Sequence, residues 1–274
     1  MRQAWAREAS ASEAILRSAR CPAPDMLTGR LLSAIANTGF FQSGGVLGGT
    51  QAFRHYPLEL GPQPPPVAHL QTGDMDLLVP SGMRLASLDR SLMAKVADLG
   101  IPVETIFPIE QDRSPKWVIG GAIEVELLSN PTRGGKASRM HRGIREHVLA
   151  LKYLDFVLKD PIDAVSLYRS GIRIAIPSPQ RYALHKLLVA QLRSGSFLGK
   201  RAKDLDQAEW LVNAMAGGRA FELWEAWNDL NQRGPGWRRL VGRSLSERPA
   251  IARILQGVEE AFGPARSGDG LRKS

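Results

Sequence analysis

The stretch that decides the fold runs from Gly44 to Val79 and begins GGVLGGTQAFRHYPLEL (Gly44–Leu60). After a proline-rich connection it continues QTGDMDLLV (Gln71–Val79). A short apolar segment enters a Gly-Gly-Thr turn, a segment with helical spacing leaves it, and Asp74 and Asp76 lie in a second apolar segment. Residues i and i+2 of a strand point to the same side. The sequence therefore predicts two buried strands, a turn between them, and two carboxylates on one strand face.

Composition narrows the class of protein. The chain has 274 residues, enough for one large domain or two ordinary ones, and its net charge of +9 comes from 36 Lys and Arg against 27 Asp and Glu. Cys21 is the only cysteine, which excludes an intrachain disulfide and a cluster of thiolate metal ligands. No apolar run reaches the roughly 18 to 20 residues of a membrane helix. We therefore expect a cytoplasmic protein with no membrane partner, and the basic charge favours a nucleotide or nucleic-acid partner.

The first half of the chain has the pattern of a mixed α/β domain. Glu124 and Glu126 alternate with apolar residues in AIEVELL (Ala122–Leu128), which predicts a strand with one polar face. Apolar spacing and turn residues predict further elements. The expected helices are 1–20, 25–37, 50–60 and 87–99, and the expected strands are 44–47, 75–79, 101–107, 116–120 and 122–128.

The second half changes to helical patterns. The segment SNPTRGGKASRMHRGIREH (Ser129–His147) is rich in Gly and Arg, which predicts a mobile connection. One strand is expected at 171–177, followed by helices at 178–192, 202–216, 221–231 and 249–262. The predicted fold class is therefore α+β, with a mixed sheet and flanking helices followed by a mostly helical C-terminal domain. The expected divisions are N-terminal helices (1–40), a sheet domain (41–148), the helical domain (149–262) and a disordered tail (263–274).

The paired aspartates predict a metal site. Asp74 and Asp76 present their carboxylates together at the start of a strand, which suits a hard cation such as Mg²⁺ or Mn²⁺. A third acid on a neighbouring strand would complete the site, and either Glu126 or Glu124 can supply it. The alternative for each carboxylate is a solvated strand end or a wet sheet face.

The turn Gly48-Gly49-Thr50 predicts a phosphate site. It lies directly before an expected helix, where backbone N–H groups are available to a phosphate and glycine allows a close approach. The Thr50 hydroxyl adds a donor. The alternative is an ordinary turn.

The order of strand, Gly-Gly-Thr, helix, Thr-x-Asp-x-Asp-Leu and third acid resembles the polymerase-β-type nucleotidyltransferase superfamily. The wider pattern resembles an uncharacterised bacterial branch with remote similarity to the nucleotidyltransferases of toxin–antitoxin systems. It is carried by VLGGTQAFRHY, TGDMDLLV and EVELLSNP in the first half, and by IRIAIPSPQRYALHKLLVAQLR and KRAKDLDQAEWLV in the second. The resemblance covers about residues 30–215.

The resemblance implies a nucleotidyltransferase-like fold and a role for individual residues. Gly49 and Thr50 match the phosphate-binding pair, and Asp74 and Asp76 match the metal-binding pair. Glu126 stands where the superfamily usually has Asp, a departure that affects the third ligand. In the helical half, Lys186, Lys203 and Asp204 match a helical Lys and a Lys-Asp element. Lys186 either contacts the triphosphate or is a helix lysine whose ammonium extends to water, and Asp204 either has a role at the site or pairs with Arg201 or Lys200.

These observations predict an enzyme, a metal-dependent nucleotidyltransferase. It would move a nucleoside monophosphate from a nucleoside triphosphate to a hydroxyl of a nucleic acid (tRNA included), a protein or a small molecule. A toxin-type enzyme with an antitoxin partner is one form of this hypothesis. The alternative is a non-catalytic nucleotide- or nucleic-acid-binding protein that keeps the fold. A basic cluster either tracks a nucleic-acid backbone or is a solvated loop. It consists of Arg133, Lys136, Arg139, Arg142 and Arg145.

Overall fold

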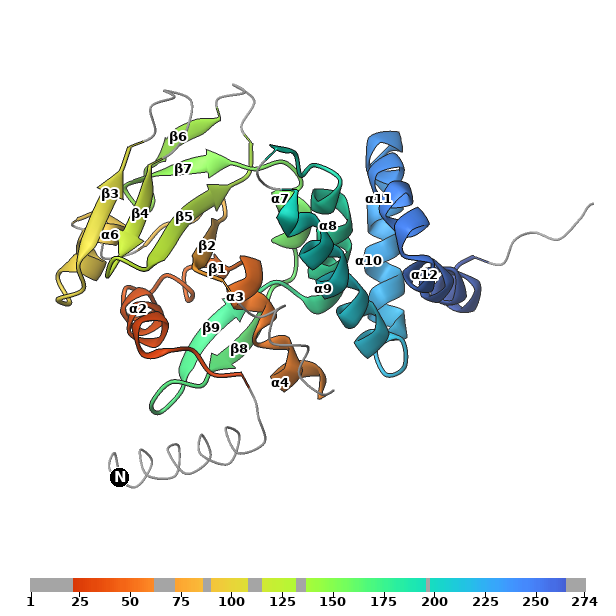
Figure 1. Ribbon diagram of the computed structural model, residues 1–274, viewed down its shortest axis with the longest axis horizontal. Helices are drawn as coiled ribbons and strands as arrows, with labels where there is room; N and C mark the ends of the chain where they lie inside the picture. The colour runs from red at the N-terminus through yellow and green to blue at the C-terminus, as the bar shows by residue number, and fades with distance from the viewer. Residues whose placement is uncertain are drawn as a thin grey trace, which may run out of the picture. The chain divides into compact units, whose positions relative to one another are not determined.

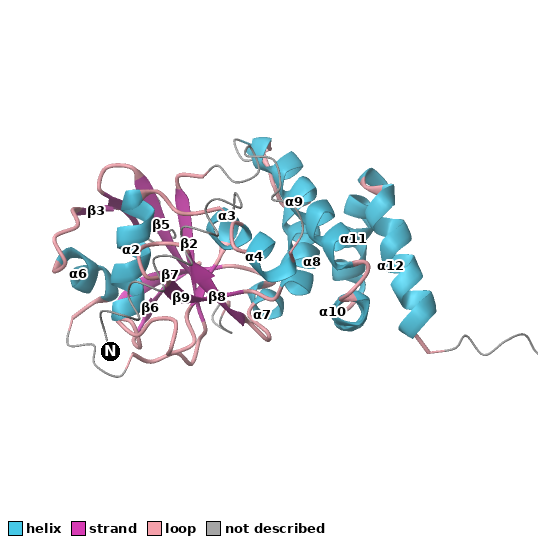
Figure 2. Cartoon of the chain, turned by 90° about the horizontal axis from the view of Figure 1, so that it is seen from below, coloured by secondary structure: helices cyan, strands magenta, loops and turns pink. Residues whose placement is uncertain are grey.

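The computed structural model describes residues 22–61, 72–85, 90–107, 115–131, 137–195 and 198–264. The chain divides into two compact units, Met1–Ser178 and Pro179–Ser274. In the described part of the chain, the first unit holds the strands and the second is helical (Figures 1 and 2). The predicted α+β class, with a mixed sheet, flanking helices and a helical C-terminal region, is confirmed.

A mixed sheet organises the first unit, and its two central strands run parallel to each other (Figure 1). The strand order is β1-β2-β5-β4-β3, and β7 also pairs with β5 and with β6. The strands are β1 (Val46–Leu47), β2 (Asp74–Val79), β3 (Val103–Ile106), β4 (Lys116–Ile119), β5 (Ile123–Ser129), β6 (Ser138–His141) and β7 (Glu146–Ala150). One edge of β5 lies along β2, while the other pairs with β4 near its start and with β7 at its end.

The central strands are positioned by their apolar residues. Met75 and Leu77 of β2 and Val125 and Leu127 of β5 are almost wholly buried, and polar residues alternate with them. Where β5 becomes buried on both faces, the hydroxyl of Ser129 donates a hydrogen bond of 2.7 Å to the carbonyl of Val79. The alternation thus leaves one polar face at the starts of both strands.

The rest of the first unit consists of short helices and a hairpin. The helices are α2 (Met26–Asn37), α3 (Gly49–Phe53), α4 (Tyr56–Leu60), α6 (Leu92–Ala97) and α7 (Leu154–Val157), and the hairpin pairs β8 (Ile162–Ser166) with β9 (Ile172–Ile176). Helix α2 contacts α6 and β9. The Tyr56 hydroxyl donates a 2.8 Å hydrogen bond to the carbonyl of Pro177, which ties α4 to the end of this hairpin.

The second unit is built from α8 (Pro179–Ala190), α9 (Gly199–Met215), α10 (Ala220–Gln232), α11 (Pro235–Glu247) and α12 (Pro249–Phe262). Helix α8 is buried along most of its length and contacts α9, α10 and α11. Polar residues also join these helices, since the Ser244 hydroxyl donates to the carbonyl of Leu187 at 2.7 Å. No helix among the described residues is both long and apolar enough to cross a bilayer.

The expectation of a mobile connection at Ser129–His147 was wrong where the structure describes it. Strands β6 and β7 form an antiparallel hairpin with the register His141↔Glu146, and residues 132–136 lie outside the described residues. The hairpin is anchored by buried polar groups, because Glu146 accepts a hydrogen bond from the backbone N–H of Met93 at 3.0 Å. Buried polar residues hide the alternation by which a strand is recognised.

Other predictions also differ from the structure, and helix α7 and strand β8 were not expected. The expected helix 50–60 is two helices, α3 and α4, because Pro57 has no N–H to continue the ladder. Helix α11 was not expected, since only Val241 and Ser244 are buried on it. The division between the units falls after Ser178, because β9 contacts β1 and α2 of the first unit. The expected helix 1–20 and the chain beyond residue 264 lie outside the described residues.

Candidate active site

Asp74 and Asp76 lie on the polar face of β2. Both are partly exposed, while Met75 and Leu77 between and beside them are buried. The strand begins where the Asp74 backbone N–H donates to the Thr72 hydroxyl at 3.0 Å. The two carboxylates therefore leave the sheet on the same side, as the i, i+2 spacing predicts.

The neighbouring strand brings two more acids to this face. In the parallel register Asp74 pairs with Glu124 and Asp76 with Glu126. Directly paired residues of neighbouring strands lie on the same face, about 5 Å apart. Four carboxylates thus lie on one face of the sheet, and we call this set (Asp74, Asp76, Glu124 and Glu126) the acidic face.

A lysine from a third strand lies among these acids. The ammonium of Lys116, at the start of β4, forms an ion pair with Glu126 and a longer one, 3.5 Å, with Glu124. Burial lowers the pKa of Lys116, but the hydrogen bond and negative charge of Glu126, with the charge of Glu124, outweigh it and raise the pKa. Lys116 was not singled out from the sequence, although KWVIG was expected as a strand and its alternation puts Lys116 on the polar face.

The acidic face offers the oxygen donors that a hard cation prefers. Within the described residues, no group of three or more His, Cys, Asp or Glu side chains is arranged to hold a metal ion. The ion pair with Lys116 engages Glu126, whereas Asp74 and Asp76 remain side by side on β2. The two aspartates therefore fit Mg²⁺ in donor chemistry, and Glu126 or Glu124 as a third ligand stays a prediction.

The Gly-Gly turn is joined to the same strand. The Gly48 backbone N–H donates to the carbonyl of Asp76 at 2.7 Å, directly before α3. Gly49 has φ +57°, and a Cβ at this position would lie 2.2 Å from Oδ2 of Asp76. Only a residue without a side chain allows the turn and the carboxylate to approach this closely. The predicted phosphate turn, with Thr50 in the first turn of α3, and the predicted metal pair are thus in direct contact.

His55 follows α3 and stabilises the last turn of that helix. Its ring is buried, and Nδ1 donates to the carbonyl of Gln51 at 2.9 Å, which caps the last turn of α3. Burial lowers the pKa of His55 to about 4, with a smaller contribution from the charge of Arg54. The imidazole is therefore neutral at pH 7, and its role is structural.

Lys186 lies in the helical unit and is buried there. Its ammonium is 2.6 Å from Oδ1 of Asp204, and Nε of Arg193 is 2.8 Å from Oδ2 of the same carboxylate. Asp204 thus pairs with Lys186 and Arg193, and not with Arg201 or Lys200 as the sequence suggested. Because the Lys186 side chain is only 9% exposed, it does not extend to water. Its contact with a triphosphate stays a prediction.

The chain is similar to known proteins in sequence and in fold. A family model described as "Nucleotidyltransferase" matches residues 26–232. Among solved structures, the chain is similar to an antigenic nucleotidyltransferase-like protein from Paracoccidioides brasiliensis, with 15% sequence identity and a TM-score of 0.48. The match covers 84% of this chain and 93% of that one. No curated protein matches.

Proposed function

This chain belongs to the nucleotidyltransferase family, and we propose that it transfers a nucleoside monophosphate from a nucleoside triphosphate to a hydroxyl acceptor. The acceptors to test first are nucleic acids, tRNA included, because the net charge is +9. A toxin-type role with an antitoxin partner would be one form of this function.

The contact between Gly49 and Asp76 carries the proposal. A triphosphate at the turn beside Gly49 and Thr50 would have its phosphates next to the Asp76 carboxylate, since a side chain at Gly49 would touch that carboxylate. The N–H of Gly48 is itself bonded to the carbonyl of Asp76, which holds the turn in place and links it to the carboxylate pair of β2. A transfer reaction needs the phosphate-binding turn and the metal-binding carboxylates within a few ångströms of the same phosphate. Their contact therefore favours a common role in nucleotidyl transfer over an ordinary turn and a solvated strand end.

Asp74 and Asp76 would hold a Mg²⁺ ion. When bound, such an ion neutralises phosphate charge and lowers the pKa of an acceptor hydroxyl. The residues of the chain contribute binding and orientation: the turn fixes the phosphates, and the sheet fixes the direction of both carboxylates. Lys116 holds Glu126 by its ammonium and keeps part of the negative charge of the acidic face balanced. Catalysis would depend mainly on positioning and on charge complementarity.

Labelling with α-³²P nucleoside triphosphates tests the proposal. The full chain is incubated with Mg²⁺, each of the four triphosphates, and tRNA, protein or small-molecule pools as acceptors. Because Asp76→Asn keeps the shape and removes the charge that holds a cation, we expect it to lower labelling by roughly 100-fold or more. Asp74→Asn is expected to act in the same direction.

Glu104→Gln is the matched control, since Glu104 lies exposed on β3, away from β2 in the strand order. It removes one carboxylate from the same sheet and should label like the wild type. Equal labelling by the wild type and Asp76→Asn would remove the basis for the assignment.

The ion pair between Lys116 and Glu126 favours a second candidate, a non-catalytic nucleotide-binding protein of the same fold. The ammonium of Lys116 is paired with Glu126, the proposed third metal ligand, and would compete with a metal ion for that carboxylate. Equilibrium binding of a non-hydrolysable triphosphate with and without Mg²⁺ separates the candidates when combined with labelling. Metal-dependent binding with no labelling of any acceptor would select the second candidate.

A further inference from the structure

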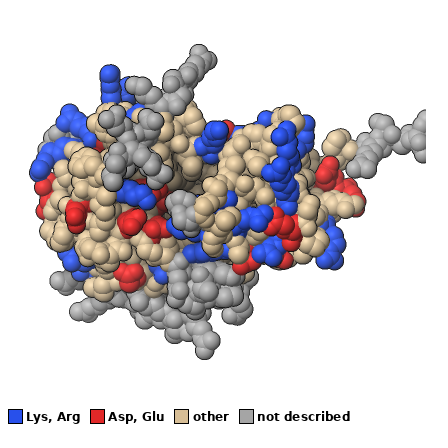
Figure 3. Space-filling model, turned by 45° about the horizontal axis from the view of Figure 1, so that its top comes forward, with Lys and Arg blue, Asp and Glu red and all other residues tan. Residues whose placement is uncertain are grey.

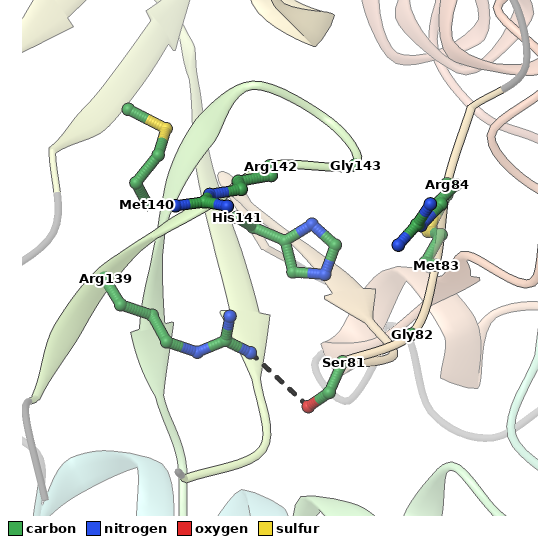
Figure 4. A pocket seen from close by; sticks show the side chains of 9 residues that line it. All are labelled: Ser81, Gly82, Met83, Arg84, Arg139, Met140, His141, Arg142 and Gly143. Atoms are coloured by element: carbon green, nitrogen blue, oxygen red, sulfur yellow. Dashed lines mark hydrogen bonds between the residues drawn. The ribbon is translucent and has the colours of Figure 1, made fainter. Parts of the chain in front are cut away.

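A basic pocket lies beyond the C-terminal end of β2, the end opposite Asp74. It has a volume of about 360 Å³ and is formed by two segments, Ser81–Arg84 after β2 and Arg139–Gly143 in the β6–β7 hairpin (Figure 4). At about 3.3 Å per residue, the strand alone places its rim on the order of 15 Å from Asp76. The pocket is therefore separate from the acidic face.

Positive charge is concentrated around this pocket. Arg84, Arg139 and Arg142 all line it, and in the described part of the chain none of the three forms an ion pair with an acid. Elsewhere arginines are commonly paired, as Arg181 is with Asp229 and Arg173 with Asp163. On the face shown in Figure 3, Lys and Arg are interspersed with Asp and Glu. Three guanidinium groups that have no acidic partner among the described residues and line one pocket favour binding of an anion.

The walls of the pocket are held in place by backbone contacts. The Leu85 N–H donates to the carbonyl of Gly143 at 3.1 Å, and a Cβ on Gly143 would lie 1.9 Å from the carbonyl oxygen of Met83. Glycine is therefore required where the hairpin meets the segment after β2. His141 adds a third link, because its Nε2 donates to the carbonyl of Pro80 at 3.1 Å. The site is formed before any ligand arrives, which reduces the entropic cost of binding.

Two buried polar atoms of the lining have no partner. Nε of Arg139 and Nδ1 of His141 make no hydrogen bond with any described residue. Of the two, only Nε of Arg139 is a donor for a phosphate oxygen, because Nε2 of His141 carries the proton of the neutral ring and Nδ1 is an acceptor. Arg139 uses another nitrogen to donate to the Ser129 hydroxyl at 2.9 Å and, weakly, to Ser81 at 3.4 Å (Figure 4). Buried polar groups without partners are rare, and a ligand or an ordered water commonly satisfies them.

We propose that this pocket binds a phosphate group, carried either by a free nucleotide or by the backbone of a nucleic-acid strand. Arginine presents paired N–H donors that match the oxygens of phosphate, and three of them around a preformed hollow give both charge and direction. Of the basic cluster predicted from the sequence, Arg139 and Arg142 line this pocket. Arg84, from a distant part of the sequence, lines it as well. Arg133 and Lys136 lie outside the described residues.

Binding measurements on the full chain test this site without any reliance on activity. The probes are inorganic phosphate, a nucleoside monophosphate and a fluorescent 12-nucleotide single-stranded RNA, each without Mg²⁺ at fixed ionic strength. The test variant is the double substitution Arg84→Gln and Arg142→Gln, since both side chains are exposed and have no structural partner among the described residues. We expect at least a tenfold loss of affinity for the phosphate-bearing probe that the wild type binds.

The control is the double substitution Arg30→Gln and Lys152→Gln, which removes two exposed positive charges from the same unit. It should change the affinity by less than about twofold. A nucleic-acid strand is the source if the RNA binds much more tightly than the monophosphate. In that case the slope of log affinity against log salt concentration should become shallower by about 1.4 in the test variant, because two phosphate contacts are lost. If phosphate and monophosphate bind as well as the RNA, the source is a free nucleotide.

Equal losses in the test and control variants, or no phosphate-bearing probe bound by the wild type, would overturn the proposal. Glu104→Gln serves as a further reference, because it removes an exposed carboxylate from β3 and should leave this binding unchanged. Because binding is measured without Mg²⁺ and without turnover, the outcome does not depend on whether the acidic face is catalytic.

Discussion

At the scale of the residue, the contact between Gly49 and Asp76 is the most sensitive point of the site. Gly49 combines a left-handed backbone with the absence of a side chain, and both are needed there. Substitution to alanine adds a strained φ and forces the Asp76 carboxylate to move.

We expect Gly49→Ala to lower the labelling activity by roughly 100-fold while destabilising the unit by about 1–2 kcal/mol. The control is Gly100→Ala, which has φ +71° and open space around the new Cβ. It should cost similar stability and leave labelling unchanged. Labelling by Gly49→Ala at the level of Gly100→Ala would show that the position of the carboxylate does not matter, and activity and urea unfolding together separate the two effects.

His55 predicts a pH dependence of stability. The folded pKa is about 4, while an unfolded histidine titrates near 6.5. Between these values the unfolded chain binds more protons, so the free energy of unfolding rises with pH across this window and is lost as pH falls. The expected change is roughly 3 kcal/mol between pH 7 and pH 4.

Urea unfolding at several pH values measures this dependence. His55→Gln should reduce the slope of the profile between pH 4 and pH 6.5, and His141, whose pKa burial also lowers, accounts for a remaining slope. His147→Gln, at an exposed position on β7, is the control and should leave the slope as in the wild type. Identical profiles for the wild type and His55→Gln would mean that the buried ring is not the source.

At the scale of the element, α8 and α9 are joined by charge as well as by apolar packing. Burial raises the pKa of Asp204, but the charges of Lys186 and Arg193 outweigh it and hold the pKa below its usual value. The stabilisation is therefore present above the unfolded pKa near 4 and is lost as pH falls below it.

Asp204→Asn leaves Lys186 buried with no counter-charge, and we expect it to destabilise the helical unit by about 3–5 kcal/mol in urea unfolding at pH 7. Glu222→Gln removes an exposed partner of Arg219 within α10 and should cost less than about 1 kcal/mol. Similar costs for both substitutions would contradict a structural role for the buried pair.

At the scale of the whole molecule, the sheet assembles the acidic face from separate parts of the chain. Asp74 and Asp76 come from β2, Glu124 and Glu126 from β5, and Lys116 from β4. The parallel register of β2 and β5 sets Asp76 opposite Glu126, although 50 residues separate them in the sequence. The basic pocket depends in the same way on the meeting of the segment after β2 with the β6–β7 hairpin.

The sequence by itself determined the elements whose periodicity is undisturbed. The strand at Asp74–Val79, the alternating strand at Ile123–Ser129 and the helices α2, α8 and α12 all follow from local patterns. It also determined which acids share the polar face of a strand, because the i, i+2 rule is local.

The tertiary structure alone decided the partners of those residues. The ion pair of Lys116 with Glu126, the burial of Lys186 against Asp204 and the pairing of β7 with β5 all depend on contacts between different helices and strands. Their energies come from burial and charge in three dimensions, which no short window of sequence encodes. The Gly-Gly turn depends on both the sequence and the tertiary structure. Its glycines are visible in the sequence, but their contact with Asp76 exists only because β2 lies beside the turn in the folded chain.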